Sequence, residues 1–459
     1  MKKVLISLVL LIVAASVAAC GGEDEGEPAD GDGSTPTARV VEITFWHSEV
    51  ASNLDAIQSL ARRFNSEQDG VKVKTAFQGN DEEAMLKLTA FLGSGDVPAL
   101  VYLAEVDTQR LVDSGVARPV QEFIDREDYD LSDFDEKAIQ YYTVDGELYG
   151  MPFGVGVPLL YYNKLDFSEV GLDPEQPPKD LEVMRVFSQK LVKRDSLGNI
   201  LRAGIALVLM PWFLEVILAE HGDFYVNNGN GREGRATEVV FDGSAGQAFF
   251  RSWHEMIEEG LAISVGRNPS YADALLAMGT GRATMSLSSS GALRSVVDVL
   301  ERGEMDVEPG VGAVPGVPGG TGLPGMAGRS LWILTGRPEE EQEAAWKFIK
   351  WLLEPEQQAE WFAGSGYLPV RISAYDLPAA QSAIAEYPLF RLPIDLFLEA
   401  PSTPESLGPL LGPFRDVREV VATAMEETVV GSRDPTEALD DAAAEANEII
   451  ENYNRRLGE

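Results

Sequence analysis

Strand and helix patterns alternate at the start of the folded part of the chain. Residues 40–46 alternate apolar and polar side chains in the manner of a strand, and residues 54–64 repeat apolar side chains at helical spacing. A second strand over 71–75, a second helix over 84–91 and a short apolar strand over 99–103 follow. Because strands that alternate with helices build sheets covered by helices, the pattern predicts an α/β fold.

The chain holds a single cysteine in 459 residues, Cys20. Its folded part therefore has no disulfide, and its stability must come from the size of its core. Cys20 ends an uncharged apolar run over residues 4–19, which follows two lysines, as in a secretory leader. The run is shorter than the ~20 residues that a membrane span usually needs. Residues 1–19 are therefore predicted to be a signal peptide.

The residues around Cys20 also carry a signal of their own. Residues 17–20, Val-Ala-Ala-Cys, resemble the bacterial lipobox, in which the cysteine thiol is diacylated and becomes the new N-terminus. This resemblance implies a lipid anchor at Cys20 and a place outside the cytoplasm, in the periplasm or at the cell surface. The alternative is an unmodified leader with an incidental thiol. Residues 20–38 are acidic and lack large apolar side chains, which predicts a flexible tether.

Length and charge bound the rest of the chain. The ~420 residues after the tether exceed what one core usually holds, so we expect two lobes. The formal net charge is -37 at pH 7. Nucleic acid is therefore excluded as a partner, since it requires a patch of lysine and arginine that neutralises phosphates. An anionic ligand would need locally placed arginine or lysine to overcome this field.

Signatures of catalysis are poor. The three histidines, His47, His221 and His254, show no paired metal-ligand spacing. Residues 229–234 match a dinucleotide fingerprint in letters, but they lie in a polar loop and open no apolar helix. Residues 288–291 lack the glycine frame of a nucleophile elbow. The sequence therefore predicts neither a cofactor nor a metal site, and no enzyme activity.

Three other stretches indicate how the chain continues. Residues 146–153 and 159–162 are predicted to form a hairpin or strand pair. Residues 308–328 are rich in glycine and proline, which is typical of a long segment that crosses between lobes. The last third is predicted to be helical over residues 339–353, 355–363 and 434–456.

Short segments along the whole mature chain share an order with one known family. They are residues 45–48, 64–65, 79–80, 105–106, 161–164, 171–179, 289–291, 330–332 and 366–369. In this order they resemble the family 1 extracellular solute-binding proteins of ABC importers, and within them the glycerol-3-phosphate-binding members. The resemblance implies a two-lobed, maltose-binding-protein-like fold of type II, with three inter-lobe crossings and the ligand in the cleft. Closure of such lobes around a ligand is a hinge motion that a membrane permease reads.

The resemblance also suggests lobe boundaries. The crossings are expected near Phe153, Ser289 and Trp351. The first lobe would then consist of residues 39–153 and 290–350, and the second of residues 154–289 and 351–459.

The family pattern carries over to individual residues unevenly. The ligand-binding residues that it implies are Asp81, Glu105, Gly156, Leu209, Trp212, Ser290, Gly328, Tyr367 and Arg391. Glu105 matches an acidic residue that accepts hydrogen bonds from ligand hydroxyls. Ser290, Gly328, Tyr367 and Arg391 fall where the family contacts phosphate or glycerol, and a guanidinium suits phosphate because it binds two oxygens at once. For Arg391 the alternative is a surface ion pair.

Three positions depart from the family pattern. Asp81 stands where the family has tyrosine, the run that ends at Gly156 stands where it has serine, and Leu209 replaces a tryptophan that packs on glycerol. Trp212 matches the next tryptophan. A smaller side chain at Leu209 enlarges the pocket, and the carboxylate of Asp81 repels a phosphate monoester. These changes favour a larger zwitterion such as glycerophosphocholine, whose quaternary ammonium would lie near aromatic faces or a carboxylate.

Two alternatives remain open. The aromatic residues also suit stacking on sugar rings, so the alternative is a sugar- or oligosaccharide-binding protein of an ABC importer. A hydrolase tethered at the cell surface would need a carboxylate pair such as Glu105 and Asp81, for which the sequence shows no pKa-raising pocket. We therefore expect a monomeric, lipid-anchored binding protein whose partners are a small solute and the transmembrane subunits of an ABC permease.

Overall fold

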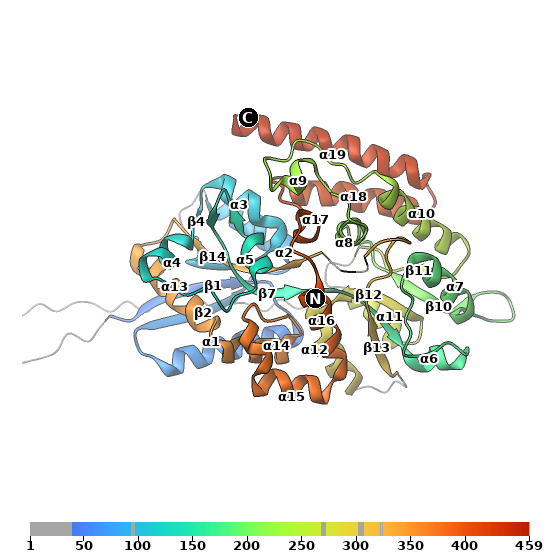
Figure 1. Ribbon diagram of the computed structural model, residues 1–459, viewed down its shortest axis with the longest axis horizontal. Helices are drawn as coiled ribbons and strands as arrows, with labels where there is room; N and C mark the ends of the chain where they lie inside the picture. Colours follow the sequence, from blue (N-terminus) through green and yellow to red (C-terminus); the bar gives the residue numbers. More distant parts are fainter. Residues whose placement is uncertain are drawn as a thin grey trace, which may run out of the picture. The chain divides into compact units, whose positions relative to one another are not determined.

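A six-stranded sheet organises the first lobe (Figure 1). Its strands are, in order, β2 (Val71–Phe77), β1 (Val41–His47), β3 (Leu100–Ala104), β14 (Ala327–Leu334) and β4 (Ala117–Arg118), and β7 (Met151–Gly156) pairs with β14. β1 runs parallel to β2 and β3, whereas β14 is antiparallel to β3, β4 and β7. All five residues of β3 are buried, as expected of a central strand covered on both faces. This computed structural model describes residues 39–92, 97–267, 272–301, 307–321, 323 and 325–458.

A second six-stranded sheet organises the other lobe. Its strands are β11 (Ala262–Ser264), β10 (Ile200–Leu207), β12 (Ala283–Ser289), β8 (Pro158–Asn163) and β13 (Pro309–Gly312), and β9 (Lys193–Arg194) pairs with β10. β10 is parallel to β11 and β12, and β8 is antiparallel to β12 and β13. A separate pair is formed by β5 (Thr143–Val144) and β6 (Glu147–Leu148).

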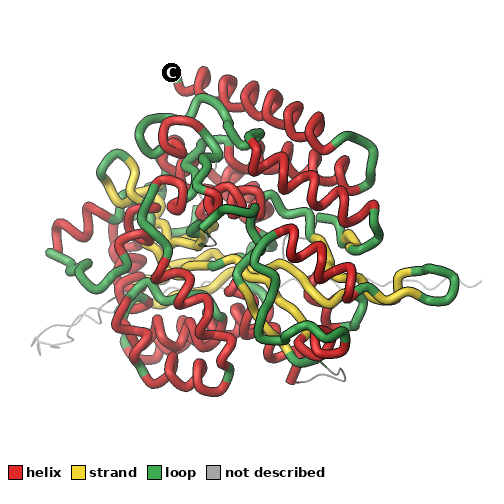
Figure 2. Tube along the Cα trace, turned by 45° about the vertical axis from the view of Figure 1, so that its right-hand side comes forward, coloured by secondary structure: helices red, strands yellow, loops and turns green. Residues whose placement is uncertain are grey.

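Helices surround the strands of both sheets (Figure 2). The helices of the first lobe are α1 (Ala51–Glu67), α2 (Asp81–Leu92), α3 (Thr108–Ser114), α4 (Gln121–Glu127), α5 (Glu136–Tyr141), α12 (Leu293–Glu301), α13 (Glu339–Leu352), α14 (Pro355–Ser365), α15 (Pro378–Glu386) and α16 (Arg391–Glu399). Four short 3₁₀ helices also belong to it: η1 (Glu105–Asp107), η2 (Ser290–Ala292), η3 (Ile372–Asp376) and η4 (Pro388–Phe390). Their apolar faces pack on the sheet and on one another, as α13 does on β1 and α14 on α1.

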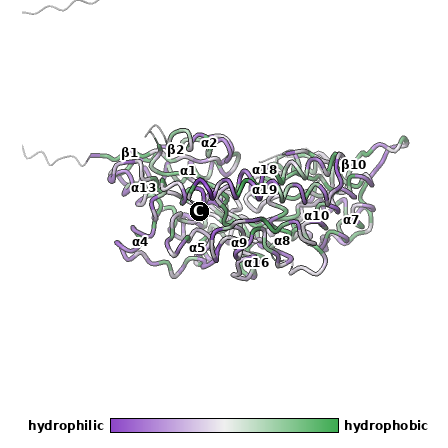
Figure 3. Tube along the Cα trace, turned by 90° about the horizontal axis from the view of Figure 1, so that it is seen from above, coloured by the Kyte–Doolittle hydropathy of each residue, from purple (hydrophilic) through white to green (hydrophobic). Residues whose placement is uncertain are grey.

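The second lobe has its own set of helices. They are α6 (Lys164–Glu169), α7 (Leu181–Leu191), α8 (Trp212–His221), the short α9 (Asn227–Gly231), α10 (Ser244–Glu258), α11 (Ala272–Gly279), α18 (Phe414–Val429) and α19 (Pro435–Leu457). α18 and α19 lie side by side (Figures 1 and 3), and both pack against α10. The small α17 (Pro404–Leu407) contacts α8 and α9 of this lobe and α5 of the first. Among the described helices, none is both long and apolar enough to cross a membrane.

The secondary structure predicted for residues 40–103 is confirmed, because β1, α1, β2, α2 and β3 follow one another there. The helices predicted in the last third are also present, as α13, α14 and α19. The predicted pairing of residues 146–153 with 159–162 is wrong. β7 belongs to the first sheet and β8 to the second, and only Val157 separates them. One residue is too short for a hairpin turn, so the chain passes directly from one sheet to the other.

The chain passes between the lobes at several places. β7 leads into β8 at Val157, and the predicted crossing near Phe153 lies close to this point. The glycine- and proline-rich segment crosses between β13 and β14, as its composition predicts. The chain leaves the second sheet at Ser289, since α12 packs on α1 and α14, and it returns to β13. The last crossing joins α16 to α18 over residues 400–413.

This last crossing differs from the expected boundary near Trp351. The buried side chains of residues 352–397 belong to the apolar cluster around the first sheet, whereas those of residues 411–450 belong to the cluster around the second. Aromatic packing explains the difference. The ring of Trp361 stacks on Phe153 with 5.1 Å between centroids, so α14 is fixed to the first sheet. The expected signal peptide, tether and Cys20 lie outside the described residues.

A buried carboxyl group in α8 contacts the crossing segment between β13 and β14. Glu220 is 1% exposed, and neither of its carboxyl oxygens has a partner among the described residues. Its backbone carbonyl accepts hydrogen bonds from the amide and the hydroxyl of Thr321, at 2.7 and 3.0 Å. Gly316 passes so close that a Cβ atom there would lie 2.7 Å from Glu220 Oε2. Burial alone raises the pKa of Glu220 to about 8.

We expect Glu220→Gln to stabilise the protein at neutral pH. The folded state binds a proton at Glu220 that the unfolded state releases above its ordinary pKa of about 4.5. The free energy of unfolding therefore falls as pH rises from about 4.5 to 8, and the variant escapes this loss. The gain is roughly 3 kcal/mol at pH 7. Thermal unfolding of both proteins between pH 5 and 8 measures it.

The exposed Glu182 in α7 provides a matched control. Glu182→Gln makes the same substitution at an exposed position and should leave the unfolding midpoint nearly unchanged. A constant difference between Glu220→Gln and the parent across this pH range would contradict the assignment.

Candidate functional site

Acidic side chains converge at one edge of the first sheet. The carboxyl ends of the parallel strands β1, β2 and β3 lie at this edge, where α/β proteins hold their ligands. Glu49 lies two residues after β1, Asp81 begins the helix after β2, and Glu105 directly follows β3. The start of the antiparallel β14 reaches the same edge, where Arg329 lies opposite Ala104.

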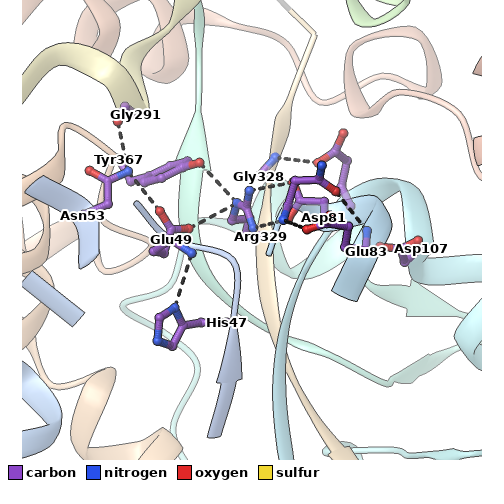
Figure 4. A network of polar contacts seen from close by, with 12 residues as sticks. His47, Glu49, Asn53, Asp81, Glu83, Asp107, Gly291, Gly328, Arg329 and Tyr367 are labelled. Carbon is purple, nitrogen blue, oxygen red and sulfur yellow. Dashed lines mark hydrogen bonds and ion pairs between the residues drawn. The ribbon is translucent and has the colours of Figure 1, made fainter. Parts of the chain in front are cut away.

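Arg329 holds the first group of these side chains together (Figure 4). Its Nη1 and Nη2 atoms donate to the two oxygens of Asp81 at 2.7 Å each. Its Nε donates to Tyr367 Oη at 3.2 Å and lies 3.3 Å from Glu49 Oε1. The side chains of Arg329 and Glu49 are 14% and 4% exposed, so the charges are almost out of water. A bidentate pair of this kind fixes both orientation and protonation.

Two glycines allow the ring of Tyr367 to lie at this place. Gly366 ends α14 with a φ of 93°, and a Cβ atom there would meet the carbonyl oxygen of Ser290 at 2.3 Å. A Cβ atom at Gly291 would lie 2.6 Å from Tyr367 Cζ. The ring also stacks on Trp361, with 5.8 Å between centroids and 5° between planes. The position of the tyrosine hydroxyl is therefore fixed by close packing on both faces of its ring.

The second lobe supplies two more arginines from the start of α18. Arg418 donates from Nε and Nη2 to Glu215 of α8, at 2.7 Å each, and from Nη2 to Glu105 Oε1 of the first lobe at 3.0 Å. Arg415 donates to both oxygens of Asp107 at 2.6 Å. The remaining oxygen of Glu105 accepts from the amide of Gly328 at 3.4 Å. These contacts join the lobes through charge.

Carboxyl groups outnumber guanidinium groups in this network, which we call the cleft network. It comprises Glu49, Asp81, Glu105, Asp107, Glu215, Arg329, Arg415 and Arg418. Burial raises the pKa of Glu49 and of Asp107 although an arginine lies beside each. Burial also raises the pKa of Glu215 to about 7 against the opposing charge of Arg418.

Asp81 behaves in the opposite way. Burial acts to raise its pKa, but the charges of Arg329 and Arg415 outweigh burial and lower it. Asp81 therefore stays ionised, while Glu215 exchanges a proton near neutral pH. The carboxylate beside Arg329 therefore stays negatively charged, whereas the carboxyl group of Glu215 beside Arg418 can be charged or neutral.

A small cavity lies beside Arg418's carboxylate partners. Its walls include Glu105, Glu215, Trp212, Tyr141 and Met326. Residues of both lobes therefore face one space, with an indole ring, two carboxyl groups and an apolar thioether. Among the described residues, no three histidine, cysteine or acidic side chains are placed to hold a metal ion.

Several residues predicted from the sequence lie together at this place. Asp81 and Tyr367 both bind Arg329, Glu105 binds Gly328 and Arg418, and Trp212 lines the cavity. Gly156 lies beside the ring of Tyr367, and Ser290 lies close to Gly366, the residue before it.

For Gly156, a Cβ atom would lie 3.6 Å from the ring of Tyr367. The hydroxyl of Ser290 accepts from the amide of Val157 at 3.1 Å.

Two predicted residues lie elsewhere. Leu209 is 3% exposed in the core of the second lobe, three residues before Trp212. The side chain of Arg391 is 60% exposed and binds Asp395 one turn along α16. The structure thus places Arg391 in a surface ion pair and does not bring it to the cleft network.

The sequence reasoning missed the three arginines that the structure brings to the cleft. Arg329 directly follows the predicted Gly328, so a strand reading of residues 327–334 would have placed it at the same sheet edge. Arg415 and Arg418 stand three apart, which puts them on one face of a helix. This spacing was the available signal, because an acidic chain needs locally placed arginines to neutralise buried carboxylates.

Comparison with known proteins matches this chain to one family. The family model of bacterial extracellular solute-binding proteins matches residues 59–390. The sn-glycerol-3-phosphate-binding periplasmic protein UgpB of Shigella flexneri serotype 5b is 30% identical over 424 residues, which cover 91% of this chain and 94% of the relative. UgpB of Salmonella typhimurium is also 30% identical, with the same coverage. The resemblance found in the short segments is confirmed.

Solved structures show the same fold. UgpB from Mycobacterium tuberculosis in complex with glycerophosphocholine superposes with a TM-score of 0.75 at 21% identity, covering 90% of this chain and 99% of that one. The GacH receptor of Streptomyces glaucescens, solved unliganded and with acarbose, gives a TM-score of 0.71 at 19% identity, with the same coverage. A maltose-bound MalE3 from T. maritima gives 0.72 at 19% identity, covering 89% of this chain and 100% of that one. The expected two-lobed, maltose-binding-protein-like fold is confirmed.

Removing Arg329 should destabilise the protein far more than removing Arg391. Arg329→Met leaves Asp81 and Glu49 without their buried counter-charge, which costs about 3 kcal/mol of unfolding free energy. Arg391→Met breaks only an exposed pair and should change little. Denaturant unfolding of both variants measures the difference. Equal losses would show that the Arg329 contacts are not buried ion pairs.

Proposed function

The chain belongs to the bacterial extracellular solute-binding proteins, and we propose that it captures a glycerophosphodiester between its lobes for an ABC importer. The observation that carries the proposal is the cleft network, in which arginines and surplus carboxylates from two lobes meet. Only a ligand that contacts both lobes favours their closed arrangement. A permease then recognises the closed form, and the protein itself performs no chemistry.

The balance of charge favours a zwitterion over a simple phosphate. A phosphate monoester would add up to two negative charges to a site that already has more carboxyl than guanidinium groups. A glycerophosphodiester with a quaternary ammonium brings one negative and one positive charge. Its phosphate would bind an arginine, and its ammonium would lie against Glu105, Asp81 or an aromatic face such as that of Trp212.

We assign the phosphate to Arg418 in place of the predicted Arg391. Arg418 belongs to the second lobe and contacts Glu105 of the first, so a ligand that binds Arg418 and Glu105 interacts with both lobes. The pKa of Glu215, raised by burial to about 7, allows this carboxyl to become neutral when a phosphate takes its place beside Arg418. Gly156, which has no side chain where the family has serine, leaves room beside Tyr367 for the longer ligand.

The names of the relatives point to the same class of ligand. The curated relatives are sn-glycerol-3-phosphate-binding proteins, and one structural neighbour was solved with glycerophosphocholine. Both ligands share the glycerophosphate group. This chain's surplus of carboxylates distinguishes between them in favour of the diester.

Calorimetric titration with glycerophosphocholine, glycerol-3-phosphate and maltotriose tests the ligand. We expect glycerophosphocholine to bind at least tenfold more tightly than glycerol-3-phosphate, and Arg418→Met to weaken its binding by at least tenfold. Arg391→Met is the matched control and should bind like the parent. Absence of heat with glycerophosphocholine, together with tight binding of another solute, would sink the assignment.

A sugar is the alternative ligand. Trp212 and Tyr141 line the cavity with two carboxyl groups, an arrangement that also suits a ring stacked on an indole with its hydroxyls donating to carboxylates. Other structural neighbours carry acarbose, mannotriose or maltose. Tight binding of maltotriose in the same titration would favour this function.

The N-terminal residues are the basis for the location that we propose. We infer that residues 1–19 are removed, that Cys20 carries the lipid, and that residues 20–38 hold the folded part beside the permease as a monomer. The curated relatives are periplasmic proteins, which agrees with an extracytoplasmic location.

Cell fractionation tests the anchor. The parent should remain with the membrane fraction, and Cys20→Ala should appear in the soluble extracytoplasmic fraction with its folded part intact. A Cys20→Ala protein that stays with the membrane would contradict lipid anchoring at this residue. A soluble parent would contradict it equally.

A further inference from the structure

A second set of charged contacts joins the lobes beyond the cleft network. Asp113 lies near the end of α3 in the first lobe, and its side chain is 5% exposed. Arg235 of the second lobe donates to both of its oxygens, at 2.8 and 3.0 Å. The hydroxyl of Tyr453 in α19 donates to Asp113 Oδ2 at 3.0 Å. One carboxylate therefore binds two separate segments of the other lobe.

The neighbouring contacts reinforce this junction. Arg110, one turn earlier on α3, donates to Asp416 of α18 at 2.6 Å, and its guanidinium carbon lies 5.9 Å from the ring centre of Tyr453. Gln109 donates to Asp113 Oδ1 at 2.7 Å within the first lobe, so the carboxylate is oriented from its own side as well. In the view of Figure 1, the C-terminal end of α19 lies above α3.

The position of Tyr453 is also fixed by its own lobe. A Cβ atom at Gly412 would lie 2.2 Å from Tyr453 Cε1, so the segment before α18 passes directly over the ring. Burial, and then the charge of Asp113, raise the pKa of Tyr453. Its hydroxyl therefore keeps its proton and remains a donor.

The junction is connected to the ligand-binding edge by one short stretch of chain. η1 presents Glu105 and Asp107 to the arginines of α18, and α3 continues directly from η1 to Asp113. Asp113 lies six residues after Asp107 along the helix, a rise of roughly 9 Å. Fixing Asp113 to the second lobe therefore also fixes the distance between the cleft carboxylates and the arginines of α18.

We propose that Asp113, Arg235 and Tyr453 form an inter-lobe latch that holds the two lobes closed by protein contacts alone. Asp113 acts as a positioning residue: it touches no part of the cleft network, but it biases the equilibrium between open and closed lobes. A receptor whose closed state is populated in advance binds with an apparent affinity increased by that population. Affinity is thus set in part at a place that the ligand does not reach.

The test measures the distance between the lobes and requires no ligand. Spin labels at Leu86→Cys in α2 and Val186→Cys in α7 report it, since these side chains are 64% and 49% exposed on different lobes. The labelled chain carries Cys20→Ser so that only these two thiols react. Pulsed electron spin resonance without added ligand should give one narrow closed distance for the parent. Asp113→Asn should add a longer distance and reduce the closed population at least threefold.

Two further variants keep the test decisive. Tyr453→Phe removes a single donor and should shift the distances in the same direction by a smaller amount. Asp133→Asn is the matched control, because Asp133 binds Arg371 at 2.8 Å within the first lobe alone. It should leave the distances unchanged.

The proposal is overturned if Asp113→Asn and Tyr453→Phe give the same inter-label distances as Asp133→Asn. It is also overturned if the parent is open without ligand. Because the readout contains no solute, these outcomes do not depend on which ligand the protein carries.

Discussion

The acidic edge of the first sheet depends on arginines for its burial. Glu49 and Asp81 pair within the first lobe with Arg329, whereas Glu105 and Asp107 pair, among the described residues, with arginines of α18 in the second lobe. A buried carboxylate without a partner costs several kcal/mol, so the fold cannot keep these groups dry unless the lobes approach. The geometry of closure is therefore set by charge pairing as well as by the hinge segments.

The packing of the first lobe supports this edge. The parallel strands β1, β2 and β3 bring three chain segments to one edge of the sheet. The antiparallel β14 adds Arg329, which is distant in the sequence. Tyr367 reaches the same line because α14 is fixed to the sheet by Trp361 and ends in a left-handed glycine. Each functional side chain is thus held by a rigid element, which preorganises the site.

The sequence allows the first lobe to be predicted further than the second. The periodicity of residues 40–103 predicts β1 to β3 correctly, because each element there alternates or repeats within its own length. Strand partners were not predictable in the same way: β7 and β8 both read as strands, but their partners lie more than a hundred residues away. The lobe to which the helices after residue 350 belong was not predictable either. It is decided by the packing of Trp361 on Phe153, which no local sequence pattern reveals.

The charge pairs of the candidate site were likewise only partly predictable from the sequence. Glu105, Asp81 and Tyr367 were predicted as binding residues and lie together, whereas the arginine was sought at Arg391, which binds a neighbour on its own helix. An arginine is recognised by the carboxylates that it meets in space, and Arg418 meets Glu105 across more than three hundred residues. Because Arg418 already binds Glu105 and Glu215, any phosphate must compete with these carboxylates for the guanidinium. Discrimination among solutes then depends on whether the displaced carboxylates find another positive partner. A ligand that carries its own cation provides one.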